Sequence, residues 1–164
     1  SAAALRVGDP LDEGTDIGAV GSSSRLARIK ELTGSADADG AQRWTSPAPL
    51  PEQGLYYPPT VFSEVGPAMR IAREELVGPV LTVLTFRTPE EAAAVVNNTP
   101  GGLGTGIWTD QGSRLTWAAR QLRVGVVWAN TGARVDPTAP FGGYRESGGG
   151  RDGGRAGLAP YLDV

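Results

Sequence analysis

The chain has 164 residues, which is long enough for one domain with its own core and too short for two large domains. Apolar residues make up 40% and charged residues 20% of the sequence, as in ordinary globular proteins, and no apolar run reaches the roughly 18 residues that would span a bilayer. The net charge of −3 and the scattered basic residues argue against a nucleic-acid surface, so we expect neither nucleic-acid nor membrane binding.

The first third of the chain is predicted to contain one helix. The serines at 22–24 can cap a helix from about Arg25 to Leu32, and Gly34 stands where a C-terminal cap belongs. The apolar residues of this helix recur every third position, at Leu26, Ile29 and Leu32. Residues 35–53 are polar with several prolines, so we expect a surface loop there.

The middle of the chain is predicted to contain two strands with a short helix between them. Residues 56–62 indicate an extended approach and a short strand, and Pro58-Pro59 argues for an edge position or a strand start. Residues 67–75 favour a short helix. Residues 80–86 are β-rich and apolar on both faces, which predicts a buried, parallel strand.

A capping box marks the start of the next helix. Thr88 is its predicted N-cap, Pro89 occupies the first helical position, and Glu91 stands three residues after the cap. The helix is expected to stop near Asn98, because a Pro-Gly-Gly sequence follows.

The last third of the chain is predicted to contain a strand–helix–strand unit. Residues 104–109 and 124–130 favour strands, and residues 112–122 favour a helix. From residue 131 onward the sequence favours loops, with a short helix over residues 154–160. Alternating strands and helices predict an α/β fold with βαβ units around a mostly parallel sheet.

Two residue types that carry much enzyme chemistry are missing from the sequence, which contains no cysteine and no histidine. Disulfides, thiolate or imidazole metal sites and a Ser-His-Asp triad are therefore excluded within this chain, and we expect no metal site. The lack of cysteine fits a cytoplasmic protein.

Two segments together point to one family. Residues 71–80 read IAREELVGPV and residues 140–153 read PFGGYRESGGGRDG. Between them come NNTPGGL at 97–103 and WAN at 128–130. This ordered series resembles the C-terminal part of the aldehyde dehydrogenase superfamily, and its final segment is most similar to tandem-domain members.

The resemblance implies an NAD(P)-dependent enzyme that oxidises an aldehyde to a carboxylic acid through a cysteine thiohemiacetal. Residues 1–164 would be the C-terminal half of its catalytic domain, without the complete Rossmann domain. No catalytic residue is then expected in this chain, because the family's nucleophile, base and oxyanion donors precede the matching segment. NAD or NADP is implied for the full-length protein, and none is expected to bind this chain alone.

The resemblance also implies a cofactor contact in the 71–80 segment. Glu75 matches the glutamate that binds the nicotinamide-side ribose, and a carboxylate is a natural acceptor for paired ribose hydroxyls. From the residues alone, a solvated carboxylate beside Glu74 is the alternative. Val77 stands where the family usually has a phenylalanine next to the nicotinamide. Arg25 and Arg28 match positions near the cofactor in some members, but we expect them to be ordinary helix-surface arginines.

A second implied region is the mouth of the substrate tunnel. Asn130 ends a predicted strand, Thr131 begins the loop that would contact substrate, and Phe141 would form an apolar wall. A packed phenylalanine that anchors the loop is an equal alternative. The family's Arg-Glu pair is Arg151-Asp152 here, and we expect Arg151 to form a local ion pair with a loop carboxylate.

Two interpretations of the whole protein remain open. The chain is either a truncated or proteolytic segment of a working enzyme, as the helix-end composition of residues 1–6 indicates, or a non-catalytic module of the same fold used for assembly. The residues upstream of Ser1 would separate the two. A segment should expose an apolar face, so the expected partners are the missing N-terminal half or further copies in a homo-oligomer, together with a small aldehyde substrate.

Overall fold

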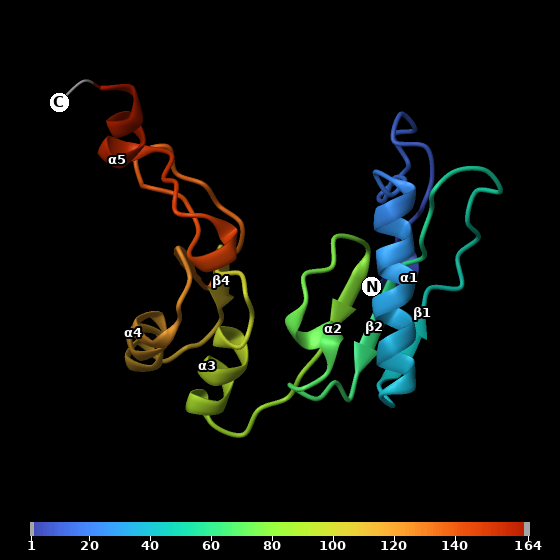
Figure 1. Ribbon diagram of the computed structural model, residues 1–164, viewed down its shortest axis with the longest axis horizontal. Helices are drawn as coiled ribbons and strands as arrows, with labels where there is room; N and C mark the ends of the chain where they lie inside the picture. The colour runs from blue at the N-terminus through green and yellow to red at the C-terminus, as the bar shows by residue number, and fades with distance from the viewer. Residues whose placement is uncertain (1, 163–164) are drawn as a thin grey trace. The chain divides into compact units, whose positions relative to one another are not determined.

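The computed structural model describes residues 2–162. The chain divides into two compact units, Ser1–Thr85 and Phe86–Val164, and each is described by itself. Figure 1 shows the course of the chain through both units.

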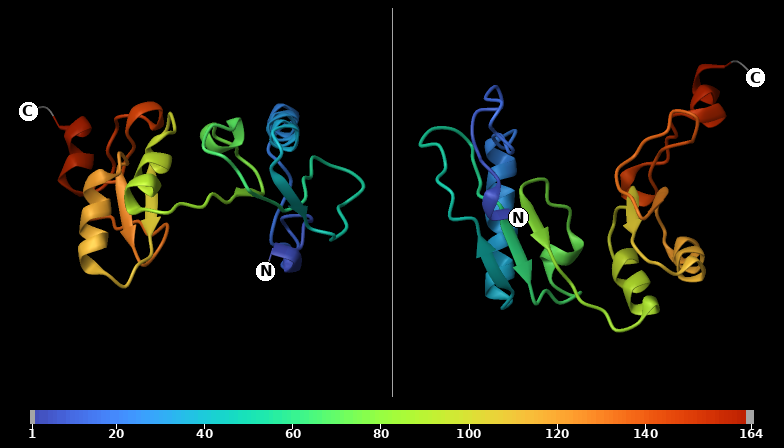
Figure 2. Two further views of the ribbon diagram at one scale, coloured as in Figure 1. Left: turned by 90° about the horizontal axis from the view of Figure 1, so that it is seen from below. Right: turned by 180° about the vertical axis from the view of Figure 1, so that it is seen from behind.

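The first unit is a three-stranded sheet with two helices on one face. Its elements are the 3-10 helix Ala2–Ala4, α1 (Ser23–Ala38), β1 (Gln42–Thr45), β2 (Thr60–Ser63), α2 (Arg70–Arg73) and β3 (Val80–Thr82). The strand order is β1-β2-β3, with β1 antiparallel and β3 parallel to β2. Helices α1 and α2 contact each other and cover the same side of this sheet (Figure 2, left).

Helix α1 begins where the sequence predicts and ends later. Ser22 is the N-cap, and its Oγ accepts the backbone N–H of Arg25 at 3.2 Å, which confirms a cap within residues 22–24, although the helix begins at Ser23, two residues before the predicted start. The predicted end at Gly34 is wrong, because the helix continues to Ala38. Ala36 is fully buried, and this packing carries the helix past the glycine. The left-handed turn falls instead at Gly40, with φ 88°.

Strand β1 lies within the segment that was expected to be a surface loop, so that prediction is wrong at residues 42–45. All four of its residues are exposed, which leaves no apolar alternation to mark a strand. Side-chain contacts with the end of α1 and with β2 hold it instead. Arg43 forms an ion pair with Asp37 at 2.7 Å and lies over the Phe62 ring, 5.2 Å from its centroid.

The positions of β2 and β3 in the sheet differ in part from the sequence-based expectations. Of the two alternatives that Pro58-Pro59 indicated, the strand start is confirmed, because β2 begins directly after Pro59 and is the central strand. Pro59 precedes the strand and removes no donor from its ladder. β3 is parallel as predicted, whereas its predicted burial is wrong. Within the described residues β3 pairs on one side only, and Leu81 is 59% exposed.

The core of the first unit forms between α1, α2 and the sheet. Phe62 from β2 is fully buried, and so is Ala36 from α1. The same cluster includes Ala41, Val65 and Ile71. A fully buried phenylalanine contributes about 1.5–3 kcal/mol by removal of apolar surface from water, so Phe62 is the largest single contributor.

The second unit is built on one βαβ motif. Its elements are α3 (Pro89–Asn97), β4 (Gly104–Ile107), α4 (Gly112–Gln121), β5 (Val126–Ala129), the 3-10 helix Arg145–Ser147, α5 (Gly154–Leu158) and the 3-10 helix Ala159–Tyr161. β4 and β5 pair in parallel on either side of α4 in the chain, so the predicted strand–helix–strand unit and the α/β class are confirmed. Figure 1 places α5 at the opposite end of this unit from α3 and α4.

The capping box of α3 is confirmed with one shift in register. Thr88 Oγ1 accepts the backbone N–H of Glu91 at 3.2 Å. The Glu91 carboxylate accepts from the backbone N–H of Arg87 at 2.8 Å, one residue before the cap. Both interactions satisfy backbone donors at the helix start.

The second unit buries little apolar surface by itself. Among residues 86–162, Ala93 is the one apolar side chain that is buried, and strand β5, which was predicted to be buried, is half-buried. Phe86 and Trp108 are 60% and 66% exposed. No helix in the described part of the chain is long and apolar enough to cross a membrane.

Candidate functional site

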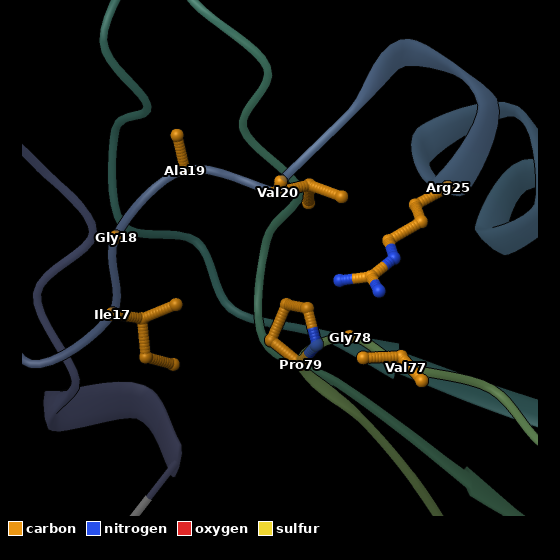
Figure 3. Close-up of a pocket in the computed structure, with 9 residues that line it drawn as sticks. Ile17, Gly18, Ala19, Val20, Arg25, Val77, Gly78 and Pro79 are labelled. Carbon is orange, nitrogen blue, oxygen red and sulfur yellow. The ribbon is translucent and has the colours of Figure 1, made fainter.

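A pocket opens in the first unit between the segment before α1 and the segment before β3. Its volume is about 410 Å³, within the range of small-molecule sites. One wall is formed by residues 17–21 and the other by residues 77–79. Arg25, from the first turn of α1, projects toward Gly78 and Pro79 across the opening (Figure 3). Most of the wall is apolar, and Arg25 is the charged side chain among the lining residues.

The wall that contains Val77 is an extended strip that follows α2. The helix ends at Glu74, whose φ of −90° and ψ of 138° turn the backbone into an extended conformation. Successive side chains of an extended segment point to opposite sides. Leu76 is half-buried, whereas Glu75 and Val77 are exposed, so these two share the outer side of the strip.

Gly78 fixes the distance between this strip and α1. A Cβ at Gly78 would lie 2.5 Å from Cδ1 of Ile29, which is itself buried on α1. A larger residue would therefore push the strip away from the helix and open the pocket wall. The backbone of Gly78 lies so close to Ile29 that no side chain fits between them. Glycine is needed here for this lack of space and not for a positive φ.

Glu75 and Arg25 are charged groups without partners. Neither side chain forms a hydrogen bond or ion pair with the described residues. Arg25 is exposed, as expected of a helix-surface arginine, but it also lines the pocket, which the sequence did not predict. Glu75 lies two residues before Val77 and outside the pocket lining. Both can accept a new polar partner without breaking an existing interaction.

Glu74 differs completely from its neighbour Glu75, because it belongs to a network of four charged side chains. Arg70 Nε donates to Glu74 Oε1 at 2.7 Å, and Arg70 Nη2 donates to Glu31 Oε1 at 2.9 Å. Arg28 Nη1 donates to Glu31 Oε2 at 2.7 Å, and Arg28 Nη2 also donates to Glu74 Oε2. The network closes a ring between α1 and α2.

The network shifts the protonation equilibria of its members. The hydrogen bond from Arg28 lowers the pKa of Glu31, and the hydrogen bond from Arg70 lowers the pKa of Glu74. Both carboxylates therefore stay ionised to lower pH than isolated glutamates. The hydrogen bonds to Glu31 and Glu74 in turn raise the pKa of Arg28 and Arg70 respectively.

The second predicted region begins at the end of β5 with Asn130. Its φ of 52° places it in the left-handed region, which asparagine tolerates better than most residues. Its side chain makes two hydrogen bonds to the backbone of Thr109. Oδ1 accepts from the Thr109 N–H at 2.9 Å, and Nδ2 donates to the Thr109 carbonyl at 3.0 Å. Asn130 therefore fixes the strand end with one of the two acceptor sites of Oδ1 and one of the two N–H donors of Nδ2.

The loop that follows Asn130 is held at two further points. Trp128 Nε1 donates to the carbonyl of Arg134 at 2.7 Å. Asp136 Oδ1 accepts from the Thr138 backbone N–H at 2.9 Å, and this hydrogen bond lowers the pKa of Asp136. Thr131 is half-buried at the start of the loop. The loop thus has a defined course although most of its side chains are exposed.

Phe141 is tied to the glycine-rich segment through its backbone. It exchanges two hydrogen bonds with Asp152, at 2.7 and 2.8 Å. The half-buried ring fits both the wall and the anchor interpretation. Between these two residues the chain is crowded. A Cβ at Gly142 would overlap the carbonyl oxygen of Gly150. The two segments next to the Phe141–Asp152 bridge therefore contact each other through their backbones.

Arg151 holds this crowded segment together, but not in the predicted way. Its Nη1 donates to the carbonyls of Gly143 at 2.7 Å and Gly150 at 2.8 Å, and its guanidinium lies over the Tyr144 ring at 4.9 Å from the centroid. Within residues 2–162 it forms no ion pair, so the predicted pairing with a carboxylate is wrong. The nearby carbonyls supply enough acceptors that no carboxylate is needed.

The described residues thus form two separate candidate regions, one in each unit. The first brings Val77 and Arg25 to one pocket and leaves Glu75 free beside it. The second places Asn130 and Thr131 at the end of β5 and Phe141 in the glycine-rich segment. In the part of the chain that the structure describes, no group of three or more acidic, cysteine or histidine side chains is placed to hold a metal ion.

Sequence reasoning missed the four-membered ion network and the pocket role of Arg25. The three-residue spacing of Arg28 and Glu31 is a local signal for one ion pair on a helix surface. Arg28 and Glu74 are 46 residues apart in the sequence, so no local sequence pattern predicts that contact. Residues 17–21, one wall of the pocket, carry no polar side chain that would have singled them out.

Comparison with known proteins gives a consistent result along the whole chain. The sequence model described as "Aldehyde dehydrogenase family" matches residues 1–164. The betaine aldehyde dehydrogenase of Cereibacter sphaeroides is 39% identical over 161 residues, which cover 98% of this chain and 33% of that protein. Betaine aldehyde dehydrogenase 2 of Rhizobium meliloti is 38% identical over 162 residues, which cover 99% of this chain and 34% of that protein.

Solved structures show the same relationship. The betaine aldehyde dehydrogenase of Staphylococcus aureus in complex with NAD+ has a TM-score of 0.91 and 32% identity, covering 99% of this chain and 33% of that one. A mutant indole-3-acetaldehyde dehydrogenase of P. syringae in complex with NAD+ and IAA has a TM-score of 0.90 and 40% identity, covering 98% and 33%. The chain spans about a third of the length of the relatives that it matches.

Proposed function

This chain belongs to the aldehyde dehydrogenase family, and from that membership we propose that it is the C-terminal half of the catalytic domain of an NAD(P)-dependent aldehyde dehydrogenase. The complete protein oxidises an aldehyde to a carboxylic acid. The cysteine nucleophile comes from outside residues 1–164, because this sequence contains none. The isolated chain is therefore inactive.

The observation that carries the proposal is the exposed carboxylate of Glu75, which lies close in sequence to the pocket lining and has no partner among residues 2–162. Glu75 shares the outer side of an extended strip with Val77, which lines the pocket. An exposed carboxylate without partners can accept both hydroxyls of a ribose, as charge-assisted hydrogen bonds that cost no existing contact. The bound dinucleotide supplies the hydride acceptor of the reaction.

Val77 and the loop of the second unit complete the proposal. Val77 offers a smaller apolar surface to the nicotinamide end than the aromatic residue usual in the family, so positioning there depends more on Glu75. Asn130 fixes the end of β5, and Thr131 and Phe141 face the path of the aldehyde. Asn130 acts through the backbone that it holds and not as a direct ligand.

The exposed apolar surface of the second unit supports a role within a larger assembly. A groove of about 500 Å³ is lined by apolar and aromatic side chains, among them Phe86, Trp108 and Trp117. Surfaces of this kind are usually covered in the assembled protein. We propose that the N-terminal half of the same polypeptide, and further subunits of a homo-oligomer, cover this unit.

The test is a comparison of two glutamate variants in the complete protein that contains this chain. Glu75→Gln should raise the KM for NAD+ by about 10-fold or more, because one charged hydrogen-bond acceptor contributes roughly 1.5–3 kcal/mol. Glu52→Gln is the matched control, since Glu52 is also exposed and has no partner among the described residues. Aldehyde-dependent NADH formation is followed by absorbance, with NAD+ and aldehyde varied separately.

Two results would contradict the proposal. One is a complete protein that forms neither NADH from NAD+ nor NADPH from NADP+ with any aldehyde of a panel that includes betaine aldehyde and indole-3-acetaldehyde. The other is a KM for NAD+ that Glu75→Gln and Glu52→Gln leave equally unchanged. The first outcome would favour the non-catalytic module, and the second would place the ribose elsewhere.

A further inference from the structure

We propose that Arg28 and Arg70 are positioning residues that hold Glu75 in place for the ribose by fixing the neighbouring Glu74. The inference rests on the proposed function, because it assigns two further residues to the same cofactor site. Neither arginine touches the pocket. Both act through the backbone at the point where α2 ends.

Glu74 connects α2 to the extended segment that contains Glu75 and Val77. It is the C-terminal cap of α2 and already has an extended backbone, and the peptide bond that follows it leads directly to Glu75. Both oxygens of its carboxylate are held: Oε1 by Arg70 Nε at 2.7 Å, and Oε2 by Arg70 Nη2 at 3.2 Å and by Arg28 Nη2. A side chain held at both oxygens from two helices has a fixed direction, and so has its backbone.

Helix α2 needs this external support. It has only four residues, and its N-cap, Met69, provides no side-chain hydrogen bond. A single helical turn is not stable by itself in water. Arg28 supplies the support from α1, a 16-residue helix whose next residue, Ile29, is buried in the first unit. Through this network, the long helix α1 stabilises the conformation of the short helix α2 and of the residue that caps it.

Glu31 links the two arginines of the network. It accepts from Arg28 and from Arg70 and holds both guanidinium groups beside Glu74. The ring consists of two arginines and two glutamates, so its formal charges balance. Arg73 is on the same short helix and forms no ion pair with the described residues, which shows that the pairing is specific to Arg70 and not a general feature of α2.

The inference predicts a loss of cofactor affinity that depends on Glu75. In the complete protein, Arg28→Ala and Arg70→Ala should each raise the KM for NAD+ by about five- to tenfold, with kcat and the KM for the aldehyde within about twofold. Arg28→Lys retains one charged donor and should restore most of the affinity. Lys30→Ala on α1 and Arg73→Ala on α2 are the matched controls, since both side chains are exposed and have no partner among residues 2–162.

A double variant separates positioning from a general structural effect. If Arg28 acts through Glu75, adding Arg28→Ala to Glu75→Gln should change the KM for NAD+ by less than about twofold. A five- to tenfold additional loss in the Glu75→Gln background would overturn the inference. So would equal effects of Arg28→Ala and Lys30→Ala, or a loss that extends equally to the aldehyde.

The same set of variants distinguishes the inference from the proposed function. If Glu75→Gln leaves the affinity for NAD+ unchanged, the proposed cofactor role of Glu75 fails and the positioning role falls with it. If Glu75→Gln weakens NAD+ binding while Arg28→Ala and Arg70→Ala do not, only the positioning role fails. The melting temperature of every variant is measured as well. The KM values for NAD+ are compared among variants whose melting temperatures are near that of wild type.

Discussion

The close contact between Gly125 and Gly142 in the second unit offers a sharp test of its loop geometry. Gly125 precedes β5, and Gly142 lies next to Phe141 in the glycine-rich segment. In Gly125→Ala, the new Cβ would overlap the carbonyl oxygen of Gly142 and lie 2.7 Å from its carbonyl carbon. It would also lie 3.2 Å from the Leu103 carbonyl oxygen. All three atoms are backbone, so no side-chain rotation can relieve the overlap.

The expected cost follows from comparison with a glycine in open space. Overpacking against rigid neighbours costs about 1–3 kcal/mol. Gly149 belongs to the same loop, has no atom within 4 Å of the position that a Cβ would take, and does not need a positive φ. Gly149→Ala should therefore stabilise the protein by about 0.4–1 kcal/mol through its unfolded state. The two variants should differ by roughly 1.5–4 kcal/mol, with opposite signs.

Urea unfolding followed by tryptophan fluorescence measures this difference, because Trp108, Trp117 and Trp128 all report on the second unit. With an m-value of about 2 kcal/mol/M, the midpoints should lie about 0.7–2 M apart. Equal midpoints for Gly125→Ala and Gly149→Ala would refute the close approach of the glycine-rich segment to β5. A midpoint for Gly125→Ala above that of wild type would refute it more directly.

Two other predictions concern the first unit. Phe62→Ala should lower the free energy of unfolding by about 3–5 kcal/mol, because this fully buried ring would leave a cavity; a loss below about 1 kcal/mol in urea unfolding would contradict that burial. The lowered pKa of Glu31 and Glu74 makes stability depend on pH. An acid whose pKa is lower in the folded than in the unfolded protein stabilises above its unfolded pKa, and this contribution disappears as the pH falls through the folded pKa. Between about pH 6 and pH 3, wild type should therefore lose more unfolding free energy than Glu31→Gln, and equal losses would contradict the network.

Local signals in the sequence predicted the capping segments of α1 and α3 correctly, whereas the helix predicted over residues 67–75 is limited to Arg70–Arg73, and the end of α1 and the position of β1 depended on distant contacts. Ser22 and Thr88 cap their helices through hydrogen bonds within three residues, so a short sequence window contains all the information. The end of α1 is decided by the burial of Ala36 against elements that follow much later. Strand β1 is exposed throughout, and its pairing with β2 crosses a long loop that no periodicity reveals.

The candidate site divides in the same way. An ordered series of motifs predicted that Glu75 and Val77 contact the cofactor; the structure places Val77 in the pocket lining and Glu75 two residues before it. It could not predict that Glu74 would be held by two arginines while Glu75 stays free, because that contrast depends on Arg28 from a different helix. The expected ion pair of Arg151 failed for a related reason, since the folded loop brings carbonyl oxygens closer than any carboxylate.

The unequal burial in the two units has a consequence for protein synthesis. The buried cluster that contains Phe62 draws its members from residues 36–71, so all of them have been polymerised before the second unit begins at Phe86. At about 5–20 residues per second, the 79 residues from 86 to 164 take roughly 4–16 s more. During that time the first unit can complete its core on the ribosome. The second unit emerges after it, with little core of its own, when the first unit has already had time to fold.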